Sequence, residues 1–243
     1  MRILTWNIGR HPPESLQSNV IGARIADEAP DIAVLTEAHS GSLDSFAGHV
    51  LDDRGVMWGG ETESERKVVL WSREPWRDRI FHPELSELGG IISAVTDSDL
   101  GPARVIGVCM PYPFAWPRGK GLDKRPPPWS QFIEFAERLA PIVKALDPGM
   151  PAVIAGDFNQ TFPIATGSWQ AHHKLKSALG RFGIITQGDI ASVDEPLLCH
   201  VAVNPQLRGT GVRGIDRFSA GKALSDHSGI VAEIGIGGIA TFD

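Results

Sequence analysis

Cysteine is scarce in this sequence, with only Cys109 and Cys199 among 243 residues. Two widely separated cysteines provide neither a disulfide framework nor the paired spacing of a structural zinc site. Their scarcity excludes the small secreted proteins that depend on disulfides for stability. It also fits a reducing compartment, and we therefore expect a cytoplasmic protein.

A long hydrophobic run is also missing, so no segment predicts a membrane-spanning helix. No secretory leader is evident, because the opening residues MRILTWNIG have the pattern of a strand that begins at Ile3. Hydrophobic residues make up 42% of the chain, which is enough for a sizeable core. Since no linker or repeat divides the sequence, we predict one domain over residues 1–243.

The chain lacks an excess of positive charge, because its formal net charge is −6. A general polyanion binder is expected to carry a basic surface, so tight non-specific binding of nucleic acid is disfavoured. Phosphate substrates are still compatible with an acidic chain. A cluster of carboxylates can hold a cation, and this cation then supplies the positive charge.

Short apolar runs bounded by Gly, Pro, Asp and Asn predict most of the secondary structure. Their length and β-branched content are typical of strands, which we predict at 2–8, 31–37, 67–72, 90–96, 103–110, 152–157, 197–203 and 228–236. Helical patterns cover 15–29, 130–140 and 168–182, with Pro141 expected to kink or end the second helix. Strands outnumber helices and rarely alternate with them strictly. We therefore predict an α/β fold of two packed mixed β-sheets flanked by helices.

Residues 111–129 form a long segment with six prolines, PYPFAWPRGKGLDKRPPPW. The segment combines basic residues with aromatic ones: Arg118, Lys120, Lys124 and Arg125 with Tyr112, Phe114, Trp116 and Trp129. A loop of this length inside a compact domain is usually functional or disordered. It is either a substrate-binding element or a solvated excursion stiffened by proline.

Residues 152–159, AVIAGDFN, carry an apolar run that ends in an acid and an amide. Side chains alternate along an extended chain, so Asp157 and Asn159 should face one side and Phe158 the other. Phe158 would then anchor the segment in the core. The same residues also suit an Asx-type turn that closes a strand, and this stretch alone favours neither interpretation.

Other predicted strands also end in polar groups, or follow them. These groups are Asn7, Glu37, Asp216, Asp226 and His227. Strand ends of a packed sandwich converge on one rim, which would bring four carboxylates together with a histidine. A hard cation with oxygen ligands, Mg²⁺ or Mn²⁺, removes the repulsion between such carboxylates. A metal, carboxylates and a histidine together suit the attack of water on a phosphate ester.

The motifs TWNI, LTE, GDFN, GIDRF and SDHSGI occur in one order along the chain. This order resembles that of the endonuclease/exonuclease/phosphatase superfamily, which includes deoxyribonuclease I-like enzymes. The resemblance extends from about residue 3 to residue 236. It implies a four-layered α/β sandwich and a divalent-metal-dependent hydrolase of phosphoesters.

The resemblance also implies roles for individual residues at a metal site. Glu37 is similar to the principal Mg²⁺ ligand of the superfamily, with Asn7 beside it. Asp226 resembles a further residue at the metal site.

Four more residues resemble the catalytic groups of the superfamily. Asp157 corresponds to the group that orients or deprotonates the attacking water, and Asn159 supports its geometry. His227 resembles the histidine that contacts the scissile phosphate, with Asp216 as its carboxylate partner. An alternative assignment makes His227 itself the base.

One position departs from the superfamily pattern. A histidine or tyrosine is usual after the strand at 103–110, but Val108 or Cys109 stands there in this sequence. Tyr112, Arg118 or Lys120 from the long loop could replace the missing phosphate contact, and we take these three as candidate substrate-binding residues.

The substrate class stays open at this point. A nuclease needs cations along the phosphate backbone and surfaces that stack on bases, and only 111–129 offers both. A small or lipid phosphodiester needs less basic surface, which the negative net charge favours. The alternative to an enzyme is a non-catalytic binding module that retains the fold.

Overall fold

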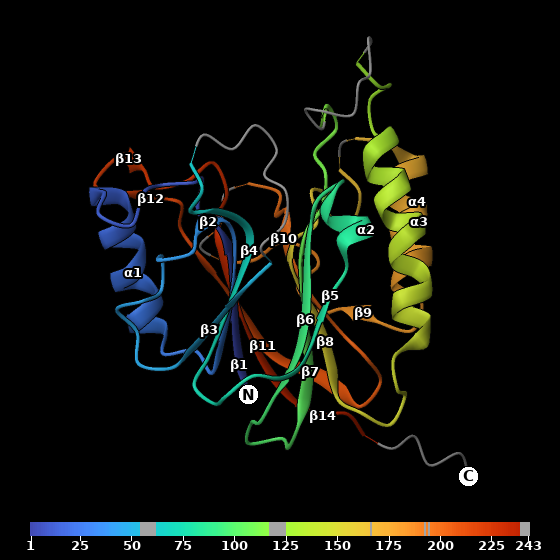
Figure 1. Ribbon diagram of the computed structural model, residues 1–243, viewed down its shortest axis with the longest axis horizontal. Coiled ribbons are helices and arrows are strands. Elements are labelled where there is room, and N and C mark those ends of the chain that lie inside the picture. Colours follow the sequence, from blue (N-terminus) through green and yellow to red (C-terminus); the bar gives the residue numbers. More distant parts are fainter. Residues whose placement is uncertain (54–61, 117–124, 166, 192, 194, 239–243) are drawn as a thin grey trace.

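The computed structural model contains two packed β-sheets with helices on their outer sides (Figure 1). It describes residues 1–53, 62–116, 125–165, 167–191, 193 and 195–238. Each sheet has six strands, in the orders β11-β14-β1-β2-β4-β3 and β5-β6-β7-β8-β10-β9. Both sheets are mixed, because β1 pairs with β2 and β7 with β8 in parallel while the other pairings are antiparallel. The predicted α/β sandwich is confirmed.

The elements occupy the following residues. The first sheet holds β1 (Arg2–Asn7), β2 (Ile32–His39), β3 (His49–Asp52), β4 (Glu65–Ser72), β11 (Leu207–Ile215) and β14 (Gly229–Ile236). The second holds β5 (Arg77–Phe81), β6 (Gly90–Thr96), β7 (Ala103–Cys109), β8 (Ala152–Asp157), β9 (Gly183–Ile184) and β10 (Cys199–Val203). A small hairpin is formed by β12 (Phe218–Ser219) and β13 (Lys222–Ala223). The helices are α1 (Leu16–Glu28), α2 (Pro83–Ser86), α3 (Ser130–Ala145) and α4 (Trp169–Leu179).

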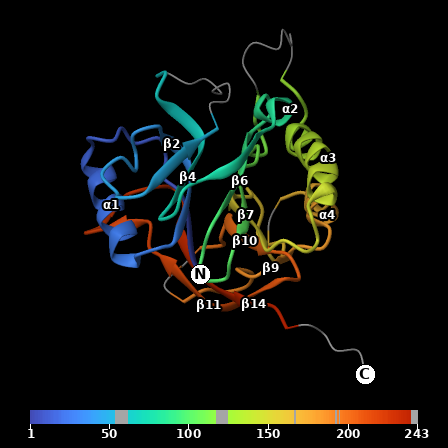
Figure 2. The same cartoon turned by 60° about the horizontal axis from the view of Figure 1, so that its bottom comes forward.

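The core has three layers, which explains why the strand sequences are apolar without interruption. In β8, Val153 and Ala155 pack between the two sheets, while Ala152 and Ile154 pack on the outer side against α3 and α4. A strand covered on both faces needs apolar residues at successive positions. On the other side of the molecule α1 covers the first sheet, and Figure 2 shows the same arrangement from the lower end.

The helices differ in detail from the sequence-based expectations. In α1 the buried residues are Ile21 and Ile25, with Val20 partly buried against the same core, while Leu16 is 68% exposed. The first residue of the helix extends beyond the sheet, with Ser15 as the N-cap.

The helices predicted at 130–140 and 168–182, which are α3 and α4, end at other residues than predicted. α3 continues through Pro141 to Ala145, because the buried Val143 still packs against the second sheet's outer core. α4 ends before Gly180, whose positive φ of 57° suits glycine, rather than at Gly183.

Two of the strands in the sheets have sequences that do not show a strand pattern. β5 is exposed at all five positions, and β11, LRGTGVRGI, is rich in glycine and arginine. Neither shows the apolar run by which eight of the strands were predicted, and the short strands β3 and β9 were not predicted either. Among the helices of the described residues, none is both long enough and apolar enough to cross a membrane.

Candidate functional site

Asp157 lies at the end of β8, directly opposite Cys109 at the end of β7. Gly156 before it has φ +142°, and a Cβ there would lie 1.8 Å from the carbonyl oxygen of Val108. Only glycine therefore lets the two parallel strands approach at this point. The close approach places the Asp157 carboxylate, 1% exposed, at the rim where both sheets end.

The Asp157 carboxylate is held by two hydrogen bonds. Its Oδ1 accepts from the backbone N–H of Asn159 at 2.9 Å, and its Oδ2 accepts from Asn7 Nδ2 at 2.9 Å. The first bond is the Asx-type turn, so the turn and the polar pocket exist together. Phe158 is fully buried, as its alternation with Asp157 predicts. Burial raises the pKa of Asp157, although His227 and the bonds from Asn7 and Asn159 oppose the shift.

Asn159 acts on this site through the backbone rather than by facing it. Its side-chain Nδ2 donates to the carbonyl oxygen of Met110 at 2.8 Å, and its φ is 47°. The residue therefore ties the segment that follows β7 to the segment that follows β8. It fixes the turn that presents Asp157.

Asn7 connects the first sheet to the second and also to the SDH segment. Its Oδ1 accepts from the backbone N–H of Gly9 at 3.0 Å, while its Nδ2 bonds to Asp157. The hydroxyl of Ser225 donates to the Asn7 carbonyl oxygen at 2.6 Å, and the backbone N–H of His227 donates to the same hydroxyl at 3.1 Å. These bonds place His227 at the same rim.

The imidazole of His227 lies between two carboxylates. Its Nδ1 is 3.9 Å from Asp157 Oδ2, and its Nε2 is 3.7 Å from Asp226 Oδ1. The side chain of His227 is 11% exposed and that of Asp226 is 78% exposed. Within the described part of the chain, Nδ1 is buried and has no hydrogen-bond partner. Each ring nitrogen of His227 therefore lies nearest to a different carboxylate.

Asp216 does not lie against His227, which corrects the expected pairing. Its carboxylate is exposed and accepts a hydrogen bond from the backbone N–H of Phe218 at 2.9 Å, while its carbonyl oxygen accepts from Arg24. No hydrogen bond or ion pair joins the two described residues. The physical reason is local: Asp216 follows β11 directly, and its carboxylate closes the turn into the small hairpin.

Glu195 contacts Ser228, the residue that follows His227. The sequence did not predict this contact. Glu195 Oε1 accepts from the backbone N–H and the hydroxyl of Ser228, at 3.0 and 2.9 Å. Its Oε2 lies 2.6 Å from Arg217 Nε. Glu195 belongs to no strand or motif, so its spacing along the chain gave no signal.

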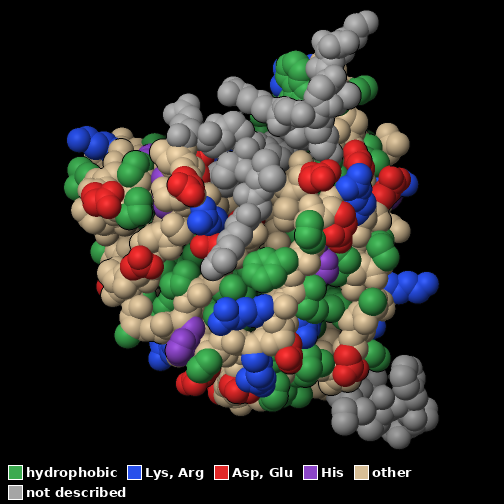
Figure 3. Space-filling view, in the orientation of Figure 1, with side chains coloured by type: hydrophobic (Ala, Val, Ile, Leu, Met, Phe, Trp, Pro, Cys, Tyr) green, Lys and Arg blue, Asp and Glu red, His purple; other side chains and the backbone are tan. Residues whose placement is uncertain are grey.

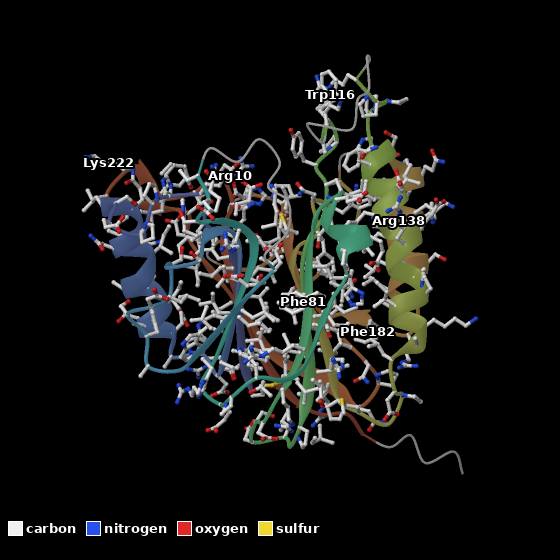
Figure 4. The ribbon with its side chains drawn as sticks, in the orientation of Figure 1. Arg10, Phe81, Trp116, Arg138, Phe182 and Lys222 are labelled. Carbon is white, nitrogen blue, oxygen red and sulfur yellow. The ribbon has the colours of Figure 1, made fainter. Side chains whose placement is uncertain are left out.

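Glu37 is paired with two basic residues. Arg10 Nε lies 3.0 Å from its Oε2, and Lys67 Nζ lies 3.3 Å from its Oε1. Burial opposes ionisation of Glu37, but the charges of Lys67 and Arg10 outweigh it and lower the pKa of the carboxyl. In Figure 4, Arg10 lies at the rim above the first sheet. Neither Arg10 nor Lys67 was predicted to contact Glu37. The one sequence signal for the second contact is that Lys67 stands at the start of the apolar run KVVLWS.

The two cysteines are buried near the site. Ligand atoms of Cys199, Asp157 and His227 lie within 4.8 Å of one another. Burial raises the pKa of both thiols well above the usual value, so they stay protonated. Val108 and Cys109, one of which occupies the position where a histidine or tyrosine is usual, are both buried.

The expected contribution of the long loop is only partly visible. Tyr112 is exposed, as is Trp116, which Figure 4 places above the rim of the second sheet. Arg118 and Lys120 lie outside the described residues. Their assignment as substrate-binding residues stays a prediction.

Two further histidines are buried. His39 is buried at the end of β2, where its Nδ1 and Nε2 lie 2.9 Å from Ser64 Oγ and 3.1 Å from the Arg10 carbonyl oxygen. His172 is buried against Phe162, whereas its neighbour His173 is exposed.

The donor set at this rim fits a hard divalent cation. Glu37 and Asp226 offer carboxylate oxygens, and Asn7 offers an amide oxygen that accepts one hydrogen bond and keeps a second lone pair. With both thiols protonated, the donors near Asp157 are oxygen and imidazole nitrogen. This chemistry suits Mg²⁺ or Mn²⁺ better than a thiolate-bound metal.

The fold is an α/β sandwich of two mixed sheets, with acidic and amide groups gathered at one rim. A sequence profile described as "Endonuclease/Exonuclease/phosphatase family" matches residues 4–194, and the chain belongs to this family. The matched region includes Asn7, Glu37, Asp157 and Asn159, and it ends before Asp216, Asp226 and His227. No curated protein sequence matches the chain.

Solved structures show the same fold at low sequence identity. An endonuclease/exonuclease/phosphatase from Beutenbergia cavernae is 18% identical, with a TM-score of 0.69 over 98% of this chain and 72% of that one. An AP endonuclease from Archaeoglobus fulgidus is 18% identical, with a TM-score of 0.68 over 96% and 98% of the two chains. A mutant beta toxin from Staphylococcus aureus, solved with bound magnesium ions, is 13% identical, with a TM-score of 0.63 over 95% and 98%. At these identities the likeness establishes the fold alone.

Proposed function

We propose that this chain is a divalent-metal-dependent hydrolase that cleaves a phosphoester bond, of the phosphodiesterase or nuclease type, by in-line attack of water. The observation that carries the proposal is the environment of Asp157. Its buried carboxylate is held by Asn7 and Asn159 and lies 3.9 Å from the His227 ring. The domain proposed to perform this reaction is the whole chain, 1–243.

Asp157 is suited to take the proton of the attacking water. Each of its oxygens accepts one hydrogen bond and keeps a lone pair for the water. Burial raises its pKa toward the working pH, which makes it a stronger base than an exposed aspartate. The two bonds from Asn7 and Asn159 also fix which direction the remaining lone pairs face.

His227 is suited to contact the phosphate. A protonated ring at this position would form ion pairs with Asp157 and Asp226 at the observed distances. Such a cation could stabilise the charge that develops on the phosphoryl oxygens. The alternative assignment, with His227 as the base, uses the same ring and the same position.

Glu37, Asn7 and Asp226 are the residues that would hold the cation. When bound, Mg²⁺ or Mn²⁺ supplies Lewis acidity toward a phosphoryl oxygen. Arg10 and Lys67 position the Glu37 carboxylate and keep it ionised. The substrate is a nucleic acid or a small or lipid phosphodiester.

One observation favours a second candidate, a non-catalytic binding module. Both oxygens of Glu37 are already satisfied by the protein's own cations. The discriminating experiment is hydrolysis of bis(p-nitrophenyl) phosphate with Mg²⁺ or Mn²⁺ and with EDTA. We expect metal-dependent turnover that Asp157→Asn reduces by about 10²–10⁴-fold while the variant keeps its fold. A folded, metal-loaded wild-type protein without turnover would support the binding module instead.

A further inference from the structure

A cavity of about 230 Å³ lies directly beside His227. Its described lining is Thr161, Glu195, Pro196, Leu197, Leu198, Asp226, His227 and Ser228. A second cavity of about 370 Å³ shares the first four of these residues and extends away from His227 along Phe162, Pro163, Ile190 and Val193. Any substrate phosphate held at Asp157 and His227 would have one of its ester groups next to this pair of cavities, which we call the side pocket.

The side pocket is acidic and partly apolar. Asp226, Glu195 and Asp189 line it, and its described lining contains neither lysine nor arginine. Glu195 forms an ion pair with Arg217 and accepts a hydrogen bond from the Ser228 hydroxyl. Leu197, Leu198 and Phe162 contribute apolar surface. A strand of nucleic acid placed here would bring phosphates against acids without the basic side chains that nucleic-acid sites use.

We propose that the side pocket binds the organic group of a small phosphodiester, and that this group is uncharged and partly apolar. The inference rests on the proposed function, because the phosphate itself would lie at Asp157 and His227. A cavity of this size holds a ring or a short chain, as small-molecule pockets do. The two acyl chains of a phospholipid would need a larger apolar surface.

The rest of the visible surface agrees with a small substrate. On the face in Figure 3, acidic and basic side chains are interspersed rather than gathered by sign. The net charge of −6 likewise gives no general attraction for a polyanion.

The test compares three substrates with the Mn²⁺-loaded protein: p-nitrophenyl phenyl phosphate, a labelled single-stranded oligonucleotide, and phosphatidylcholine vesicles. We expect the highest kcat/KM for the aryl diester. Pro196→Lys, at an exposed position of the pocket lining, should raise KM for the aryl diester about tenfold, and Leu198→Ala should do the same by removing apolar surface. Both variants are checked by thermal unfolding, and Pro196→Lys should unfold like the wild type.

The control is Asp27→Lys, an exposed residue of α1 that is not part of the pocket lining. It should leave all three kcat/KM values unchanged. A higher kcat/KM for the oligonucleotide or the vesicles would overturn the inference, as would folded pocket variants that behave like Asp27→Lys. Such results would leave the proposed function intact, whereas failure to hydrolyse any diester would remove both.

Discussion

The side-chain amide of Asn7 donates to Asp157 Oδ2 across 2.9 Å, and this single bond joins the end of β1 in one sheet to the end of β8 in the other. Both groups are almost fully buried, with exposed fractions of 3% and 1%. The bond therefore has two effects. It helps to hold the sheets together at the rim, and it favours the ionised form of the carboxyl on which the proposed chemistry depends.

Replacing Asn7 should change both stability and the pH–rate profile. Asn7→Ala leaves a buried carboxylate without one of its donors, which should lower the free energy of unfolding by about 1–3 kcal/mol. The pKa of Asp157 should rise further, so the acidic limb of kcat/KM should move to higher pH. Asn7→Asp should move it more, because a second carboxylate then faces the first.

The matched control for Asn7 is Asn204, a fully buried amide near the other end of β8. Its Oδ1 accepts from the backbone N–H of Ala152 and its Nδ2 donates to the Met150 carbonyl oxygen. Asn204→Ala should cost comparable stability without moving the pH–rate profile. Equal shifts in both variants would show that Asn7 acts on the fold alone.

Acid should destabilise the protein through His200, a residue of β10 packed under Phe158 and 1% exposed. Burial lowers the pKa of His200 to about 4, so the folded protein holds the ring neutral. In the unfolded chain the ring takes up a proton below its ordinary pKa of about 6.5, so stability is present above that pH and is lost as the pH falls toward 4. The corresponding loss is about 3 kcal/mol.

Urea unfolding at pH 7 and pH 4.5 measures this loss. His200→Gln should lower stability at pH 7 and flatten the dependence on pH, whereas His173→Gln, at an exposed position of α4, should leave it as in the wild type. The raised pKa of Asp157 acts in the opposite direction, because its unfavourable ionisation in the folded state is relieved as the pH falls. Comparison with Asp157→Asn separates the two groups. A wild type equally stable at both pH values, with Asp157→Asn no steeper, would contradict the role of His200.

Metal binding should depend on Glu37 and be opposed by Lys67. Millimolar Mg²⁺ or Mn²⁺ should raise Tm because it binds only the folded state, and Glu37→Ala should remove most of the rise. Lys67 Nζ lies 3.3 Å from the same carboxylate and repels a second cation there. Lys67→Met should therefore lower the half-saturating concentration of Mn²⁺ about fivefold, a gain of about 1 kcal/mol.

Arg73→Met, at an exposed arginine paired with Asp31, is the control for Lys67→Met and should leave the Mn²⁺ titration unchanged. The two titrations are read as Tm against metal concentration, so they require no turnover. A wild type that responds to neither metal would remove the cation site. Weaker Mn²⁺ binding in Lys67→Met would show that the lysine supports the metal instead of competing with it.

The sequence predicted the parts of the fold that follow from burial on two faces. Apolar runs such as 152–157 became strands that are buried on both faces, and the strand pattern and the order of motifs both predicted the sandwich. β5 and β11 were missed because their residues face solvent and carry glycine, arginine and aspartate. Strand assignment there depends on the neighbouring strand, which is distant in sequence.

The candidate site likewise contains residues that the sequence predicted and residues that it did not. Asp157, Asn7 and His227 were predicted together, and the structure brings them together because each ends or precedes a core strand. Glu195 and the ion pairs of Glu37 depend on segments that meet only after folding. The expected partner Asp216 turns into solvent, because a bond to its own chain two residues on is available locally.

The proposed catalytic unit is therefore His227 with Asp157, and Asp216 should contribute little. Asp157→Asn and His227→Ala should each lower kcat/KM by about 10²–10⁴-fold, and the double variant should be no worse than the more damaging single one, because both act on one water and one phosphate. Asp216→Asn provides the same chemical change at an exposed position and should lower kcat/KM less than about threefold, since the hydrogen bond of its side chain is to the backbone N–H of Phe218. The measurement is steady-state hydrolysis of a chromogenic diester, with Tm recorded for each variant. Losses that multiply in the double variant would show that Asp157 and His227 act separately, and a severe loss in Asp216→Asn would show that the hairpin rearranges to bring this carboxylate to the site.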